Sequence, residues 1–251
     1  EVLLHQSVKI RIGAIQALGW LHINEPFVIE ALKERLGDTD DLVRQTSAEV
    51  LRDFGHVSAI IDALDHPQHE VRAGAAKALC HLHVVSYPAV EALRKRLSDP
   101  HDTVWKAVTE TLRRIGRIDI IEEALNDASP SMRGAAARAL RYLGIKTPQV
   151  LTALKNRLGD DEETVQREAA EALSALGYDK LIIEALSSPE VQVRLGAIRA
   201  VEWLNLRNQS AIEVLKERLG DDESSIYESA AEVLIKLRGV GILSNSLSHP
   251  N

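Results

Sequence analysis

The stretch VRAGAAKALCHL, from Val71 to Leu82, decides the fold because the same phrase returns three more times in the chain. Its counterparts are IRIGAIQALGWL at 10–21, MRGAAARALRYL at 132–143 and VRLGAIRAVEWL at 193–204, each 61 residues from the next. Alanine and leucine are strong helix formers, so each copy predicts a helix. A fixed internal period of this kind indicates a repeat architecture.

Each 61-residue unit contains two smaller ones. The apolar residues that open the predicted inner helices are Ile10, Val43, Val71, Val104, Met132, Val165, Val193 and Ile226, in steps of 33 and 28. A single helix pair cannot bury its apolar stripe alone, whereas stacked pairs share a continuous core. We therefore expect an all-α, right-handed α-solenoid of about eight helix pairs. It forms one domain over residues 1–251, with compound units at 10–70, 71–131, 132–192 and 193–251.

The turns carry the usual signals for helix ends. PFVIEALKERL at 26–36 predicts an outer helix, and Gly37 after it predicts a glycine stop. The next inner helix is predicted to end at Gly55. At three turns the sequence predicts a helix start made of a capping residue followed by proline in the first helical turn. The three dipeptides are Asp99-Pro100, Ser129-Pro130 and Ser188-Pro189.

The segments HEVRAGAAKAL and ETVQREAAEAL resemble the HEAT repeat family in its turn-plus-helix pattern. The pairs average about 30 residues, shorter than the roughly 40–47 of HEAT and armadillo units. This length resembles the compact bacterial-type HEAT-like repeats, also called PBS-lyase-like. Such arrays occur as adaptors, as phycobilin lyase-like and DNA glycosylase-like proteins, and as arms of NACHT-type signalling ATPases. The links LHINEPFVIEAL and LGIKTPQVLTAL look most like the last group.

Composition narrows the classes of function. The formal net charge of −7 argues against a dedicated nucleic-acid binder, which usually has a basic surplus. A single cysteine, Cys80, excludes an internal disulfide framework and fits a reducing, cytoplasmic setting. No apolar run approaches the length of about 20 residues that spans a bilayer.

The two ends lack the polar capping repeats that a complete solenoid needs. Glu1 aligns with Glu184, in the middle of an outer helix, and VGILSNSLSHPN at 240–251 predicts an outer helix before an inner helix that Pro250 would open. We expect an excerpt of a longer array, whose uncapped ends would allow end-to-end self-association.

The recurring arginine allows two interpretations. Arg11, Arg72, Arg133 and Arg194 would form a row of cations for an anionic ligand, or a structural ladder. In the ladder, which we favour, each arginine reaches an acidic or carbonyl group in a neighbouring turn, because its planar fork of donors suits such pairing. The acidic positions that recur are Asp38, Asp99, Asp160 and Asp221, each three residues after Arg35, Arg96, Arg157 or Arg218.

The solvent side of the longer inner helices follows from a turn of about 100° per residue. It contains Leu195, Arg199 and Glu202, with the counterparts Ala73, Lys77 and Cys80; Gly134, Arg138 and Arg141; Ile12, Gln16 and Gly19. An aromatic or histidine position flanks it: Trp20, His81, Tyr142 and Trp203. The candidate partner-binding residues are Lys77, Arg138, Arg141, Tyr142, Arg199 and Trp203. Neutral drift of solvated positions and lateral packing of the aromatics remain the alternatives.

Metal binding and catalysis have no comparable signal. His66 and His69 are separated from Cys80, His81 and His83 by a helix that spans about 18 Å, whereas zinc ligands lie about 2 Å from the ion. No glycine-rich phosphate loop, H-E-x-x-H or G-x-S-x-G motif is present. We expect no enzyme activity, metal or cofactor.

The function that these observations predict is a scaffold that binds a protein or peptide along the concave groove, as part of a larger protein. A sensor or autoinhibitory arm of a NACHT- or STAND-type ATPase is the alternative that the resemblance implies. A phycobilin lyase-like or DNA glycosylase-like enzyme is the further alternative, without a residue motif.

Overall fold

The computed structural model describes residues 2–238, and the chain divides into two compact units, Glu1–Ile121 and Glu122–Asn251. The first unit contains η1 (Val2–Leu4), α1 (Val8–Trp20), α2 (Pro26–Arg35), α3 (Asp41–Asp53), α4 (Val57–Asp62), η2 (Ala63–Asp65), α5 (His69–His81), α6 (Tyr87–Arg96) and α7 (Asp102–Arg114). Helix α8 (Ile118–Ala124) contains the boundary. The second unit contains α9 (Pro130–Leu143), α10 (Pro148–Arg157), α11 (Glu163–Ala175), α12 (Asp179–Ala185), α13 (Val191–Trp203), α14 (Gln209–Glu217), η3 (Arg218–Gly220) and α15 (Ser224–Arg238).

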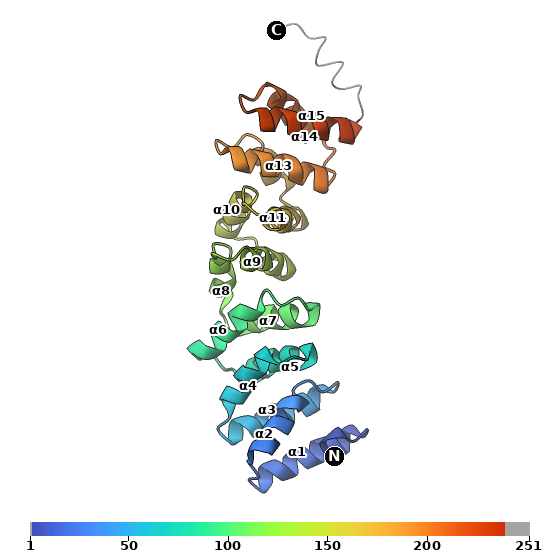
Figure 1. The fold of residues 1–251 in the computed structure, drawn as a ribbon, viewed down its shortest axis with the longest axis vertical. Helices are drawn as coiled ribbons and strands as arrows, with labels where there is room; N and C mark the ends of the chain where they lie inside the picture. The colour runs from blue at the N-terminus through green and yellow to red at the C-terminus, as the bar shows by residue number, and fades with distance from the viewer. Residues whose placement is uncertain (1, 239–251) are drawn as a thin grey trace. The chain divides into compact units, whose positions relative to one another are not determined.

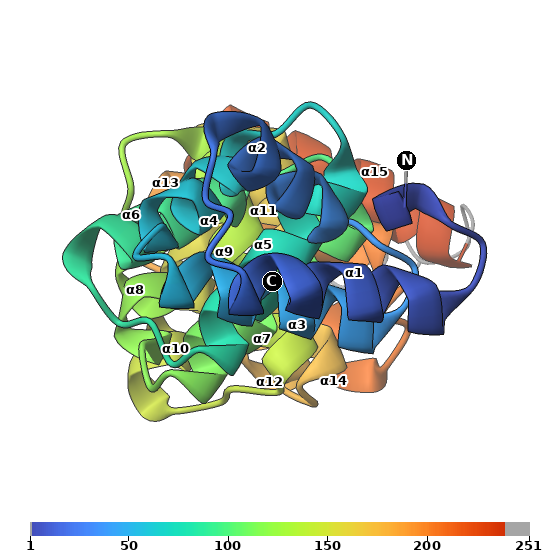
Figure 2. The same ribbon diagram turned by 90° about the horizontal axis from the view of Figure 1, so that it is seen from below.

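All regular elements in the described range are helical, so the chain is an α-solenoid of helix pairs, as the repeat predicts. In the first unit the inner helices α1, α3, α5 and α7 pack against one another in chain order (Figure 1). Figure 2 shows α1 beside α3 at the start of that unit. In the second unit α9, α11, α13 and α15 pack in the same way. Outer helices in each unit pack against the inner helices that follow them, as α2 does against α3 and α10 against α11.

The core consists of the apolar positions that the period predicts. Val28, Ile29, Leu32 and Leu36 are buried along α2 and its end, at helical spacing. Small residues fill the centre of the inner helices, with Ala75, Ala136 and Ala197 fully buried at the same repeat position. The alternation of 33 and 28 residues follows from the outer helices together with the links before them. Helix α2 has 10 residues after a link at 21–25, whereas α4 has six after a shorter link at 54–56.

Glycines at two positions allow the helices to approach closely. A Cβ on Gly74 would lie 1.7 Å from the carbonyl oxygen of Leu36, and a Cβ on Gly196 would lie 1.6 Å from that of Leu158. Gly13 occupies the same repeat position, yet a Cβ there would meet nothing within 4 Å. The close packing is therefore found at Gly74 and Gly196 but not at Gly13.

Helix α2 ends directly before Gly37, as predicted, but Gly37 is not in the left-handed conformation of a glycine cap. The helix ends in right-handed conformation at Leu36, and Gly37 instead makes room for α5, since a Cβ there would lie 2.7 Å from Val71 Cγ2. The predicted stop at Gly55 is correct, with φ of +79°. The inner helices α1, α5, α9 and α13 are followed by a residue in the same left-handed conformation, at His22, His83, Gly144 and Asn205, three of which are not glycine.

One of the three predicted proline starts is correct. Ser129 is the N-cap of α9 and Pro130 is in its first turn. Helix α7 begins at Asp102, two residues after Pro100, and α13 begins at Val191, two residues after Pro189. In both turns the residues around proline supply carbonyls or a carboxylate to an arginine before the helix begins. The outer helix predicted at 240–251 lies outside the described residues.

Candidate functional site

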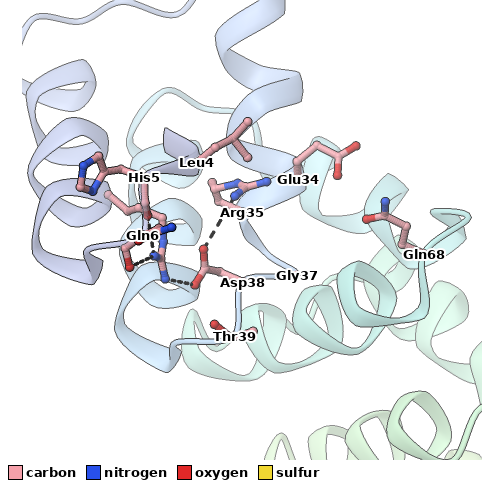
Figure 3. A pocket seen from close by; sticks show the side chains of 10 residues that line it. Leu4, His5, Gln6, Glu34, Arg35, Gly37, Asp38, Thr39 and Gln68 are labelled. Atoms are coloured by element: carbon pink, nitrogen blue, oxygen red, sulfur yellow. Dashed lines mark hydrogen bonds and ion pairs between the residues drawn. The ribbon is translucent and has the colours of Figure 1, made fainter. Parts of the chain in front are cut away.

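The recurring arginines and aspartates form ion pairs that link one turn to the next. In the first unit Arg11 Nη2 donates to Asp38 Oδ1 at 2.7 Å, and Arg72 binds Asp99 through Nε and Nη2 at 2.8 and 3.0 Å. Arg35, three residues before Asp38, approaches the other oxygen at 3.8 Å. Figure 3 shows Asp38 and Arg35 in the pocket beside His5 and Gln6. The arginine thus contacts an aspartate 27 residues later in the chain.

The second unit repeats this arrangement. Arg133 binds Asp160 through two donors at 2.7 and 2.6 Å, and Arg194 donates to Asp221 at 3.0 Å. Each arginine also donates from Nη1 to two carbonyl oxygens in the turn that precedes its helix; for Arg133 these belong to Asp127 and Ala128. One guanidinium therefore fixes an inner helix to the turns on both sides.

Burial and pairing act in opposite directions on the aspartates in the middle of the ladder. Burial raises the pKa of Asp99, but hydrogen bonds from Arg72 and the His101 amide, with the charges of Arg72 and Arg96, outweigh it. The pKa of the Asp99 carboxyl is therefore below its ordinary value. The pKa of Asp160 is lowered in the same way, against burial, by Arg133, the Glu162 amide and the charge of Arg157. Both carboxylates are thus held in the charged form.

The geometry supports the structural interpretation of the arginine row. The side chains of Arg11, Arg72, Arg133 and Arg194 are nearly buried, and each has an aspartate partner within its own unit. A ligand would have to displace these pairs to reach the guanidinium groups. The row is therefore part of the frame that positions the exposed residues.

Among the candidate binding residues, Lys77 lies in the first unit. Its side chain is exposed and makes no hydrogen bond or ion pair within the described residues. Burial of part of its stem, followed by the charge of Arg44, lowers the pKa of the ammonium group. Arg44 lies near this part of α5, since a Cβ on Gly74, three residues before Lys77, would lie 3.4 Å from Arg44 Cδ. Lys77 is a cation that the first unit leaves available.

Arg138 and Arg141 lie on α9 in the second unit, close to the carboxylates of α11. Arg141 forms an ion pair with Glu168 at 3.3 Å and a second with Glu171. Burial raises the pKa of Glu168, and the charges of Arg141 and Arg138 oppose this effect without cancelling it. Arg141 therefore belongs to a half-buried cluster between two inner helices rather than to a free cationic surface.

The other three candidates also lie in the second unit. Arg199 donates to Gln166 Oε1 at 3.2 Å, and the Arg167 guanidinium stacks 4.9 Å from the ring centroid of Trp203. Tyr142 is 49% exposed. The contact of Trp203 with α11 favours lateral packing at that residue, while Tyr142 and Arg199 keep solvent-facing surface.

Two residues assigned to the solvent side are in fact buried. Ala73 and Cys80 are 6% and 8% exposed, because α3 and α7 cover α5 from both sides and neither side chain is long enough to reach past them. Three neighbours of the candidate cations, Arg44, Gln166 and Glu168, are not among the residues that the sequence predicts. Their signal was present in the spacing, since Gln166 and Arg44 each lie 33 residues before the cation that they approach.

No group of three His, Cys, Asp or Glu residues within 2–238 is arranged to hold a metal ion. Over the same residues, no helix has the length and apolar character needed to cross a bilayer.

The comparison with protein families identifies the class. The sequence model of HEAT repeats matches residues 1–62, 57–119 and 118–182, which is well over half of the chain. The chain therefore belongs to the HEAT repeat family, as the repeated phrase predicts. A comparison with curated protein sequences gives no match.

Solved structures that match this chain have diverse descriptions. A human deoxyhypusine hydroxylase in complex with glycerol is 20% identical with a TM-score of 0.34, over 94% of this chain and 93% of that one. The complex of CpcE and CpcF of phycocyanin lyase from Nostoc sp. PCC7120 is 23% identical with a TM-score of 0.31, over 94% and 92%. An engineered protein is 19% identical with a TM-score of 0.30, over 100% and 83%. Likeness at this level carries no argument about function.

Proposed function

We propose that this HEAT-repeat chain is a recognition scaffold that binds a partner protein on the solvent-facing surface of its inner helices. The observation that carries the proposal is the division between constant and variable repeat positions. The constant alanine is fully buried at Ala75, Ala136 and Ala197. Two positions that vary between repeats face solvent. The first is occupied by Gln16 and Lys77 in successive 61-residue units, and the second by Trp20 and Tyr142.

A rigid frame with a variable surface suits binding, because function depends on the residues placed on a fold rather than on the fold itself. Repeat arrays also present extended surfaces that contact a partner at many points. Aromatic residues and arginine, both present at the variable positions, contribute strongly to protein interfaces. The proposal assigns no catalytic step, metal or cofactor to the chain.

The partner that we propose is a protein or peptide in a cytoplasmic setting. The formal net charge of −7 disfavours a phosphate backbone as the ligand. The one cysteine, Cys80, is a buried free thiol, which is typical of proteins in reducing compartments.

Charge reversal on the two faces tests the proposal in the source cells. The inner variant carries Lys77→Glu and Arg199→Glu; the matched outer control carries Glu30→Lys and Glu213→Lys on exposed positions of α2 and α14. A specific partner that co-purifies with the unaltered protein should be recovered about tenfold less with the inner variant and normally with the control. Equal recovery with both variants would contradict binding at the inner face, provided urea unfolding shows both to be stable.

A further inference from the structure

The first unit contains a pocket between α1 and α3 that the candidate residues above do not use. Its volume is about 620 Å³, within the range of ligand sites. We call it the α1–α3 pocket; its lining residues include Gly19, Trp20, Thr46, Glu49 and Asp53. All of them belong to the first unit, and inner helices pack on this pair within the same unit.

The third 61-residue unit, 132–192, shows which side chain occupies the equivalent space there. Residue 141 lies 122 positions after Gly19 and is an arginine, which reaches from α9 to α11 and binds Glu171. Glu171 is in turn the counterpart of Glu49. The first repeat therefore keeps the glutamate and lacks the arginine that pairs with it, and a cavity is present where the third repeat has a side chain.

The carboxylates of the pocket have free acceptor capacity. Glu49 Oε1 contacts His81 Nε2 at 2.9 Å, and Asp53 Oδ1 contacts Arg52. The second oxygen of each carboxylate has no hydrogen bond or ion pair within the described residues. Both side chains are about half exposed or more, at 45% and 63%, so a cation from solvent can reach them.

The wall of the pocket adds an aromatic surface. Trp20 is 80% exposed and lines the pocket together with the two carboxylates. At the same repeat position in the fourth repeat, Trp203 carries the Arg167 guanidinium 4.9 Å from its ring centroid. A guanidinium over an indole is favourable because the ring face is electron-rich, and arginine combines this stacking with bidentate donation to a carboxylate.

We propose that the α1–α3 pocket receives an arginine side chain of the partner protein, held between the Trp20 indole and the carboxylates of Glu49 and Asp53. This inference rests on the proposed function in that the ligand belongs to a protein. It shares Trp20 with the surface proposed there and adds Glu49 and Asp53 of α3. The partner segment would be basic, which suits the acidic net charge of the chain. In this arrangement an arginine in trans takes the place that Arg141 takes in cis.

A titration with blocked amino acids tests the pocket directly. The probe is Nα-acetyl-arginine amide, and the matched control is Nα-acetyl-citrulline amide, which has nearly the same shape without the charge. The readout is the set of indole Nε1–H resonances of Trp20, Trp105 and Trp203 in a ¹H–¹⁵N spectrum, assigned with Trp20→Phe. We expect the Trp20 resonance to shift and saturate with the arginine probe while the other two stay in place.

Variants then separate the pocket from unspecific attraction. Glu49→Gln should weaken the arginine probe about tenfold, and Glu110→Gln, the same repeat position in α7, should leave it unchanged. Gly19→Arg combined with Val50→Ala copies the third repeat, where Arg141 and Ala172 stand, and should abolish the shift by filling the pocket in cis. The Val50 change is needed because a Cβ on Gly19 would lie 3.1 Å from Val50 Cγ2.

Four results would overturn the inference: no shift of Trp20 with the arginine probe, equal shifts with citrulline, parallel shifts of all three indoles, or an unchanged response in Glu49→Gln. The outcome is independent of the charge-reversal test on Lys77 and Arg199. If the Trp20 resonance shifts but charge reversal at Lys77 and Arg199 leaves partner recovery unchanged, the interface would lie at the α1–α3 pocket instead of at those two residues. If the Trp20 resonance does not shift but charge reversal reduces partner recovery, the inner-face proposal would stand and the pocket proposal would fail.

Discussion

Replacing Gly74 by alanine should destabilise the first unit, although alanine is the better helix former. In an open helical site the change stabilises by about 1 kcal/mol, because glycine loses more backbone freedom on folding. At Gly74 the added Cβ would lie 1.7 Å from the Leu36 carbonyl oxygen, and real Cβ atoms essentially never approach closer than 3.0 Å. The end of α2 and the middle of α5 must therefore separate by at least 1.3 Å.

Such overpacking costs about 1–3 kcal/mol or more, and here the obstacle is backbone rather than a flexible side chain. We expect a net loss of about 2 kcal/mol in the free energy of unfolding of Gly74→Ala, measured by urea denaturation with circular dichroism. Gly13→Ala is the matched control, since a Cβ there meets nothing within 4 Å, and it should gain up to about 1 kcal/mol. If Gly74→Ala were as stable as Gly13→Ala, the close approach of α2 and α5 would be refuted.

Further predictions concern the ladder and the helix ends. Asp160→Asn should cost about 3 kcal/mol in urea unfolding, because Arg133 loses a buried bidentate partner. Asp99 and Asp160 have lowered pKa values, so their contribution to the free energy of unfolding is complete above about pH 5 and is lost as the pH falls through their pKa values in the folded state. The free energy of unfolding of the double asparagine variant should therefore fall less steeply on acid titration than that of the unaltered protein. Thr111→Val should cost about 1 kcal/mol by removing the hydrogen bond to the Ala76 carbonyl, and an equal melting temperature would contradict this. His83→Gly should stabilise by about 1 kcal/mol, because His83 has φ of +53°; a destabilised variant would show that its side chain matters more.

The repeat register and the ladder were predictable because they depend on spacing alone. Arg72 and Asp99 recur with the period, and the two positions keep the same separation of 27 residues, so their side chains must meet in the same way in every repeat. The buried core was predictable for the same reason, since helical periodicity places Val28 and Leu32 on one face of α2.

The contacts between inner helices were not predictable in this way. Which residue of α11 meets Arg141 depends on the crossing and the relative shift of two helices, and a helical wheel contains neither. The same limit explains the error at Cys80. A helical wheel places this residue on the solvent side, but the neighbouring helices cover it. The α1–α3 pocket had a signal in the sequence, because Gly19 stands where the other repeats have Cys80, Arg141 and Glu202.

Photo-crosslinking from defined positions tests the central proposal, a partner bound on the inner-helix face, most directly. A photoreactive amino acid is placed at 77 or 199 on the inner helices, or at 30 or 213 on the outer helices, in the protein expressed in its source cells. The proposal predicts that one protein is crosslinked from the inner positions and not from the outer ones. Crosslinks to the same protein from the outer positions alone would contradict it.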